Sequence, residues 1–231
     1  MICKSSIINK DDRLVFVFFS GLGSGHEFWD ELLPYFSEFN CVLLAENYFN
    51  SPNEIDDGYL REILEGKRII GVGHSLGYHK LCYLNQKYDF FKLDKIVALE
   101  GFSRYLGSSP LIAKFREFFL NLMKLNYQTF PEVTLYNFLL MCGAPMQSVP
   151  LTMNKNLIMT DLELLYSGIE SPQIPHLVLR SYDDWVIPTY IIEDNFRNLS
   201  DVKIIYTYGA SHLLGIKLPQ YVSQKILKFA N

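Results

Sequence analysis

Residues 68–83 read RIIGVGHSLGYHKLCY, and this stretch decides the expected fold. Its first part is a short apolar run typical of a buried strand, and its last part has the pattern of an amphipathic helix. Between the two lies a Gly-x-Ser-x-Gly pattern, formed by Gly73, Ser75 and Gly77. A turn this tight strains the serine backbone, and glycine is needed on both sides because side chains there would collide. We therefore expect the Ser75 hydroxyl to stand above the sheet edge, at the positive end of the helix that follows.

The composition is typical of a single globular domain. The chain has 231 residues, of which 49% are apolar and 20% are charged, enough for a sizeable core. Its formal net charge of −4 argues against nucleic acid as a partner, because phosphate binding needs a basic face. The N-terminal apolar run is too short for a signal peptide, and no later stretch approaches a membrane span. We therefore expect a cytoplasmic protein.

Short apolar runs alternate with helical patterns along most of the chain. The expected strands are residues 2–9, 14–19, 41–44, 69–72, 95–99, 176–179 and 202–208. Helical patterns are found at residues 28–36, 59–65, 76–83, 188–198 and 219–229. Strands that alternate with helices form a mostly parallel sheet with helices on both faces. The expected fold class is therefore α/β.

The alternation is interrupted between residues 104 and 175, where only helical patterns occur. Two wide apolar helical faces are expected in the first half of this segment. Further on, Thr160 and Glu163 have the spacing of a capping box, which predicts that a third helix opens there. We therefore divide the chain into a core of residues 1–103 and 176–231 and a helical cap or lid of residues 104–175.

Four expected strand ends carry residues suited to chemistry, because catalytic groups in open α/β sheets gather at the carboxyl ends of strands. They are the glycine-rich loop at 20–25, Ser75, Asp184 and His212. A serine hydroxyl is a poor nucleophile at neutral pH, so His212 would take its proton as it attacks, and Asp184 would orient the imidazole. Backbone N–H groups of Leu22 and Leu76 would hold the developing oxyanion.

Each of these assignments has a plainer alternative. Ser75 could be an ordinary helix cap, and His212 could be a loop histidine without a chemical role. Of the three residues, the acid is the one that the sequence pattern identifies least clearly. Asp183 is adjacent to Asp184, and Glu100 also ends an expected strand.

The remaining histidines and the cysteines show no metal-site spacing. No pair of histidines has the HxxxH or HExxH arrangement of zinc enzymes, so we expect neither a metal nor another cofactor. We expect His74 to pack between strand and helix, His79 to lie at a surface or interface, and His176 to have no role. The cysteines are widely spaced and are expected to be reduced thiols: Cys3, Cys41, Cys82 and Cys142.

Several segments resemble those of a known family. They are Ser20-Gly21-Leu22-Gly23 with Phe28-Trp29, the cap segments 119–122 and 162–165, and the later segments 182–188 and 210–212. Together with the serine turn, they make the chain similar to α/β-hydrolases over nearly its whole length. Within that superfamily it most resembles the pimeloyl-acyl-carrier-protein methyl ester esterases of biotin synthesis. The family's Asp-x-x-x-Pro spacing selects Asp184, which lies four residues before Pro188.

The resemblance implies an α/β-hydrolase fold with an inserted helical cap, and a serine carboxylesterase that needs no cofactor. The implied substrate is pimeloyl-acyl-carrier-protein methyl ester, whose hydrolysis releases methanol. Phe119, with Phe115 and Phe118, would line an acyl channel under the cap. The alternatives are another esterase, a thioesterase, a lipase or a carbon–carbon bond hydrolase on the same scaffold. A non-catalytic relative that binds a ligand or partner is a further alternative.

The sequence departs from the family's pattern at two positions and has no obvious basic face on the cap. Ser20 stands where the family usually has histidine, and Tyr78 stands where a second glycine is common. Acidic and basic residues balance over the cap as a whole, but four of the basic ones precede Asn126 with only Glu117 against them. These four are Arg104, Lys114, Arg116 and Lys124. This segment could face an acidic carrier protein, and a solvated helix face is the other interpretation.

Overall fold

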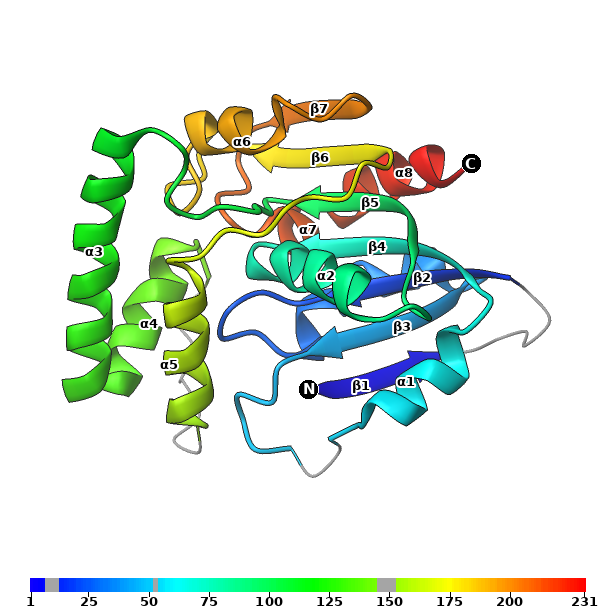
Figure 1. The fold of residues 1–231 in the computed structure, drawn as a ribbon, viewed down its shortest axis with the longest axis horizontal. Helices are drawn as coiled ribbons and strands as arrows, with labels where there is room; N and C mark the ends of the chain where they lie inside the picture. The colour runs from blue at the N-terminus through cyan, green and yellow to red at the C-terminus, as the bar shows by residue number, and fades with distance from the viewer. Residues whose placement is uncertain (7–12, 52–53, 145–152) are drawn as a thin grey trace.

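The computed structural model describes residues 1–6, 13–51, 54–144 and 153–231, and its centre is a seven-stranded sheet (Figure 1). The strands are β1 (Ile2–Ser6), β2 (Leu14–Phe19), β3 (Asn40–Ala45), β4 (Arg68–His74), β5 (Leu93–Leu99), β6 (His176–Ser181) and β7 (Val202–Thr207). Their order across the sheet is β1-β3-β2-β4-β5-β6-β7. Strand β1 runs antiparallel to β3, and the other neighbouring pairs are parallel. All seven predicted strands are confirmed, although residues 7–9 of the first lie outside the described residues.

Helices cover both faces of this sheet. Helices α2 (Leu76–Lys87) and α6 (Thr189–Phe196) share one face, where the rings of Tyr78 and Phe196 meet at a centroid distance of 5.4 Å. Helices α7 (Leu214–Lys217) and α8 (Pro219–Ala230) pack against two short 3-10 helices, His26–Trp29 and Leu33–Phe36. Helix α1 (Asp57–Leu64) lies beside β1 (Figure 1). Because helices cover both sides, β2 and β3 are buried along nearly their whole length, which explains their unbroken apolar sequences.

The helix predicted over residues 28–36 is divided into the two 3-10 helices. Pro34 lies in the first turn of the second one. Since proline has no N–H to donate and its ring excludes a preceding helical turn, a continuous α-helix cannot pass through this position. The apolar spacing was still informative, because Phe28, Trp29 and Phe36 are all buried.

The turn between β4 and α2 is so tight that glycine is required on both sides of Ser75. A Cβ atom on Gly77 would lie 2.0 Å from the carbonyl oxygen of Phe19, and one on Gly73 would lie 2.4 Å from the backbone of Tyr78. Distances this short are sterically forbidden, so only glycine lets α2 approach the sheet. Ser75 itself has a φ of 53° and a ψ of −122°, the strained conformation that the sequence predicts.

Tyr78, which stands in place of the family's second glycine, is accommodated by a glycine after β5. A Cβ atom on Gly101 would lie 2.6 Å from the Cβ of Tyr78, so the tyrosine uses the space that Gly101 leaves. The tyrosine is fully buried, and its hydroxyl is hydrogen-bonded to Ser171 Oγ (3.0 Å) and His176 Nε2 (2.9 Å). His176, for which the sequence predicts no role, therefore ties α2 to the first residue of β6.

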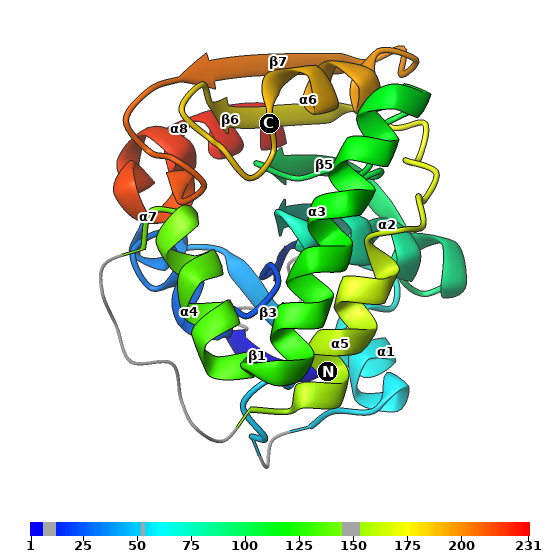
Figure 2. The same ribbon diagram turned by 90° about the vertical axis from the view of Figure 1, so that its left-hand side faces the viewer.

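Three cap helices lie between β5 and β6 in the chain: α3 (Pro110–Thr129), α4 (Pro131–Met141) and α5 (Lys155–Leu164). They stand together at the end of the sheet to which the arrowheads of β3 and β6 point (Figures 1 and 2). An isolated antiparallel bridge between Arg104 and Gly168 closes their base. A mostly parallel sheet with a helical insertion is thus confirmed, while the exact limits of the cap at 104 and 175 stay a prediction. Within the described residues, no helix is long and apolar enough to cross a bilayer.

The prediction that a capping box opens a helix at Thr160 is wrong, because α5 has already begun at Lys155. Asn154 caps that helix by accepting a hydrogen bond from the N–H of Leu157 (3.1 Å). Thr160 lies in mid-helix, where its hydroxyl donates to the carbonyl of Asn156 (2.9 Å). The Ser/Thr-x-x-Glu spacing also occurs inside helices, where threonine bonds backward to the preceding turn instead of capping.

Candidate active site

Ser75 lies at the carboxyl end of β4 with its hydroxyl free for chemistry. Its N–H donates to the carbonyl of Leu99 on β5 (3.1 Å), which holds the turn against the sheet. The residue is only 5% exposed, and its side chain makes no capping hydrogen bond to α2. Ser75 thus occupies the N-cap position of α2 but does not cap the helix with its side chain, as the plainer interpretation would require. A strained, buried serine that does not cap its helix is what a nucleophile at a strand end requires.

His212 and Asp184 come together from two different strand ends, after β7 and β6. Nδ1 of His212 donates to Oδ2 of Asp184 over 2.8 Å, and both side chains are 1% exposed. Oδ1 of Asp184 accepts from the N–H groups of Val186 (2.8 Å) and Ile187 (3.0 Å). With the proton on Nδ1, Nε2 of His212 is the acceptor nitrogen, and it is buried without a partner among the described residues.

Asp183, the first alternative acid, is turned away from the imidazole. Its carboxylate accepts hydrogen bonds from the N–H groups of Gly209 (2.9 Å) and Ser211 (3.1 Å), and from the hydroxyl of Ser181. These bonds, above all the one from Ser181, lower the pKa of Asp183 to about 2. Asp183 therefore holds the turn that precedes His212, while its neighbour Asp184 contacts the ring.

Glu100, the second alternative acid, contacts the backbone after His212. Its Oε2 accepts from the N–H of Leu214 (3.1 Å) and lies 3.8 Å from Nε2 of His74. Burial raises the pKa of Glu100 well above its usual range, and the charge of Asp184 adds to this. A carboxyl group that favours its neutral form is poorly suited to stabilise an imidazolium.

His74, the residue before Ser75, supports the loop of His212. Its ring stacks on Phe28 at a centroid distance of 4.0 Å, and its Nε2 donates to the carbonyl of His212 (3.0 Å). Burial, and secondarily the neighbouring His212, lower the pKa of His74 well below its usual value. The predicted packing role of His74 thus extends to a direct contact with the backbone of the candidate base.

The glycine-rich loop after β2 approaches the serine turn closely. A Cβ atom on Gly21 would lie 2.9 Å from Nδ1 of His74 and 3.0 Å from the Cβ of Ser75. Ser20, at the position where the resembled family usually has histidine, is buried and donates its hydroxyl to the carbonyl of Gly25 (2.7 Å). The serine therefore gives the loop an internal hydrogen bond.

Leu22 and Leu76, the predicted oxyanion donors, have free N–H groups. Neither donates to an acceptor among the described residues. Leu76 is the first residue of α2, and the first N–H groups of a helix have no partner within it. Both side chains are buried, at 6% and 2% exposure. The two donors thus belong to the loop and the turn that Gly21 brings into contact, an arrangement that suits an oxyanion.

Helix α4 of the cap packs directly onto this site. A Cβ atom on Gly23 would lie 2.8 Å from Cδ1 of Leu135, so this leucine lies against the glycine-rich loop. At the end of the helix, the carbonyl of Cys142 accepts from the N–H of His212 (3.1 Å). The cap is therefore joined to the loop of the candidate base by a main-chain hydrogen bond and lies against the glycine-rich loop.

A buried polar network joins α5 to the same loop. Asp161 accepts from the hydroxyl of Tyr48 and from Nζ of Lys80, both over 2.5 Å. The Tyr48 hydroxyl in turn accepts from the N–H of Gly23. Burial raises the pKa of Asp161 and Lys80 opposes that shift. This network could not be predicted from the sequence, because Tyr48 and Asp161 are 113 residues apart and no local pattern connects them.

Phe119, predicted to line an acyl channel, lies in a cavity of the cap. This cap cavity is open to solvent, has a volume of about 690 Å³, and is lined by residues of α3, α4 and the segment 185–190, together with Tyr105 and Phe130. Phe115 also lines it, whereas Phe118 is 57% exposed and is not part of its wall. Ser75 is not part of the wall either. The structure thus brings Phe115 and Phe119 together without bringing them to the serine.

His79, expected at a surface or an interface, is buried, so it does not lie at the surface and instead packs against the segment that leads into the cap. It is 4% exposed, and its Nδ1 lies 3.3 Å from the carbonyl of Ser103, in the segment that leads into the cap. Burial lowers the pKa of His79 to about 4. The sequence could not show that this segment covers the outer side of α2.

His74, Glu100 and His212 form the one candidate cation cluster among the described residues. Their ligand atoms lie within 4.8 Å of one another. However, His74 donates to a backbone carbonyl, Glu100 accepts from a backbone N–H, and His212 is bound to Asp184. Each residue thus has one atom bound to the protein, while a second atom of each is buried without a partner among the described residues: Nδ1 of His74, Oε1 of Glu100 and Nε2 of His212. All four cysteines are free thiols.

Comparison with known proteins gives a match in structure alone. No family model matches the chain, and no curated protein matches it by sequence. A lipase-esterase related protein from Clostridium acetobutylicum is 17% identical, with a TM-score of 0.73 and coverage of 98% of each chain. An enol-lactonase from Burkholderia xenovorans is 13% identical, with a TM-score of 0.77 and coverage of 99% of this chain and 95% of that one. An esterase from Exiguobacterium antarcticum is 10% identical, with a TM-score of 0.78 and coverage of 98% and 94%.

Likeness at 10–17% identity speaks for the fold alone. By their descriptions, the three neighbours named above are a lipase-esterase related protein, an enol-lactonase and an esterase. Their agreement over nearly the whole chain accords with the strand order, the serine turn and the helical insertion described above. The predicted fold class is therefore confirmed: this chain has the α/β-hydrolase fold.

Proposed function

We propose that this protein is a serine carboxylesterase in which Ser75, His212 and Asp184 form the catalytic triad. The observation that carries the proposal is the state of His212, whose Nδ1 donates to Asp184 and whose buried Nε2 has no partner among the described residues. An imidazole held in this tautomer is ready to accept a proton from a serine. Ser75 is the serine that we assign as the proton donor. Its backbone is strained, and the ring of its neighbour His74 lies 5.0 Å from the ring of His212.

In the proposed reaction, Ser75 Oγ attacks the ester carbonyl while its proton passes to Nε2 of His212. The tetrahedral oxyanion accepts hydrogen bonds from the N–H groups of Leu22 and Leu76, and each such donor is worth about 3–4 kcal/mol in the transition state. The intermediate then expels the alcohol, which takes the proton from His212 and leaves an acyl group on Ser75. Water, deprotonated by His212, repeats the sequence and releases the carboxylic acid.

Replacement of the nucleophile tests this mechanism. We expect the purified protein to hydrolyse p-nitrophenyl butyrate, and Ser75→Ala to lower kcat/KM by roughly 10⁴-fold or more, because no attacking group remains. Ser167→Ala, which removes an exposed hydroxyl of the cap, is the matched control and should retain full activity. Equal activity of Ser75→Ala and the wild type would disprove the mechanism.

A second prediction distinguishes the two adjacent acids. Asp184→Asn should lower kcat by roughly 10⁴-fold, because an amide at this place favours the wrong tautomer of His212. Asp183→Asn should leave kcat within a few-fold of wild type and lower the free energy of unfolding by about 1 kcal/mol, through weaker bonds to the turn before His212. Kinetics on p-nitrophenyl butyrate and urea denaturation measure the two effects. The reverse pattern would assign the role of acid to Asp183.

The low pKa of Asp183 leads to a prediction of how the stability of the fold depends on pH. Its pKa of about 2 in the folded protein lies below the ordinary value of 3.8. Its contribution to stability is therefore present above about pH 4 and is lost as the pH falls toward 2. Thermal denaturation should show a smaller fall in Tm between pH 4 and pH 2 for Asp183→Asn than for the wild type. Parallel Tm curves for the two proteins would contradict this account.

We further propose, from the sequence resemblance, that the natural substrate is pimeloyl-acyl-carrier-protein methyl ester, hydrolysed in the cytoplasm. The first cap segment would then receive the carrier protein. Of its four basic residues, Arg104 and Lys114 are exposed, whereas Arg116 is buried and Lys124 is paired with Glu163. Docking of an acidic carrier would therefore depend on Arg104 and Lys114.

Charge reversal tests the carrier protein as partner. Lys114→Glu should raise KM for the carrier-bound methyl ester several-fold at low salt and leave hydrolysis of p-nitrophenyl butyrate unchanged. The wild-type chain should also restore growth of a biotin auxotroph that lacks this esterase. Good expression without rescue, together with activity on p-nitrophenyl butyrate, would refute the substrate and leave the esterase mechanism standing.

A further inference from the structure

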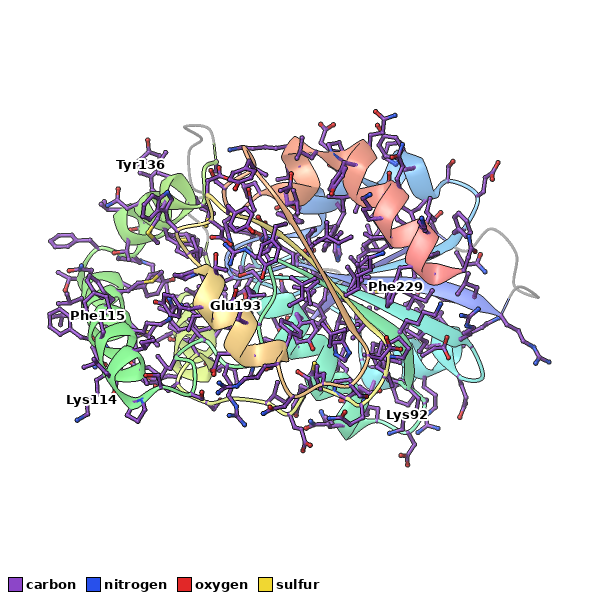
Figure 3. The ribbon with its side chains drawn as sticks, turned by 90° about the horizontal axis from the view of Figure 1, so that it is seen from above. Lys92, Lys114, Phe115, Tyr136, Glu193 and Phe229 are labelled. Atoms are coloured by element: carbon purple, nitrogen blue, oxygen red, sulfur yellow. The ribbon has the colours of Figure 1, made fainter. Side chains whose placement is uncertain are left out.

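The cap cavity has the size and the lining of a small-molecule site. Its volume of about 690 Å³ lies within the range of such sites, and it is bounded by α3, α4 and the segment 185–190. Aromatic and aliphatic side chains form most of its wall, Phe119 and Trp185 among them. Figure 3 shows Phe115, another wall residue, on α3 at the end of the molecule far from Phe229.

Arg116 is the one charged residue on the described wall of this cavity. It is only 7% exposed, and its guanidinium lies 4.0 Å from the ring centroid of Tyr105. Nε donates to the carbonyl of Tyr105 (2.7 Å), and Nη2 donates to the carbonyl of Val186 (3.3 Å). No carboxylate of the described residues pairs with Arg116, and its Nη1 donates to none of them.

A buried guanidinium without a carboxylate partner is unusual, because arginine is almost never buried unless it is paired. Removal of an ion from water is costly, and two carbonyl groups with one aromatic ring offset only part of that cost. Nη1 of Arg116 is not among the buried polar atoms that lack a partner, so it reaches open space at the cavity that Arg116 borders, where an anion would supply a charged partner. The bond would be charge-assisted, and the burial of the Arg116 side chain would strengthen it.

The remainder of the wall indicates which anion fits. A single guanidinium matches the single charge of a carboxylate, whereas a phosphate dianion would leave excess charge among apolar side chains. The polar residues Asn126, Thr134 and Asn137 of the wall are uncharged, so nothing on the described wall repels an anion. The apolar lining calls for a ligand with an apolar body.

We propose that the cap cavity binds an organic carboxylate with an apolar body, and that Arg116 binds its carboxylate group. This site goes beyond the proposed hydrolysis, because Ser75 is not on its wall. It nevertheless adjoins the catalytic acid. Val186, whose carbonyl accepts from Arg116, donates its own N–H to Asp184.

Isothermal titration calorimetry of the full chain with octanoate and octan-1-ol tests the proposal, since the two probes share a chain and differ in charge. The wild type should bind octanoate at least tenfold more tightly than octanol. Arg116→Gln should weaken octanoate binding roughly tenfold to a hundredfold and leave octanol binding unchanged. Arg13→Gln, which removes an exposed arginine of the core, is the matched control and should bind both probes as the wild type does.

A second variant fills the cavity and leaves Arg116 in place. Asn137 is exposed and lines the cavity, so Asn137→Trp should fold normally and weaken both probes. The proposal would be overturned if the wild type bound octanoate and octanol with equal affinity, or if it bound neither probe. Both of these outcomes are measured on the wild type and need no variant. Unchanged octanoate binding in Arg116→Gln, with a lower kcat and a shifted pH profile on p-nitrophenyl butyrate, would overturn it in favour of a positioning role for Arg116 on the Asp184 loop.

Discussion

Helix α2 lies so close to β2 that the carbonyl oxygen of Phe19 occupies the space that a side chain at position 77 would need. This approach leaves the chain a single tight turn in which to pass from β4 into α2. Ser75 takes up that turn in a left-handed conformation, which costs on the order of 1–3 kcal/mol and persists because the packed sheet below holds both ends. The same conformation keeps the hydroxyl from capping α2. A packing constraint in the core thus prepares the serine for chemistry.

The other strand ends and the cap are fixed around that serine mainly by hydrogen bonds to the backbone. His74 and Glu100 hold the backbone at and after His212, and two N–H groups hold the carboxylate of Asp184. The cap joins the same set of contacts, since Cys142 accepts from the N–H of His212. The side chains that carry the proposed chemistry therefore depend on the cap for their position as well as on the sheet.

Local sequence patterns were enough to predict the strands and the serine turn, because each of these depends on neighbours within a few residues. Other features depend on contacts between residues far apart in the chain, and these could not be predicted from local patterns. The resemblance selected Asp184 over the adjacent Asp183 by its spacing to Pro188, but the different contacts of the two acids appear only in the structure, where Asp184 contacts the His212 ring and Asp183 accepts from the N–H of Ser211. Similarly, the sequence alone does not explain how a tyrosine fits at position 78, where the resembled family often has glycine. The space comes from Gly101, which is 23 residues later in the chain and lies beside Tyr78 in the fold. The helical spacing of apolar residues could place Phe119 on an apolar face of α3. Which cavity that face lines depends on how α3 packs against α4.

The central claim is that Ser75 is an activated nucleophile, and covalent labelling tests it most directly. The native protein is treated with a fluorophosphonate probe, and the modified residue is identified by tandem mass spectrometry. The account predicts one adduct per chain, located on Ser75, that forms at least a hundredfold more slowly in His212→Ala, because the base that activates the serine is missing. Absence of labelling, or slow labelling spread over several exposed serines and unaffected by His212→Ala, would contradict it.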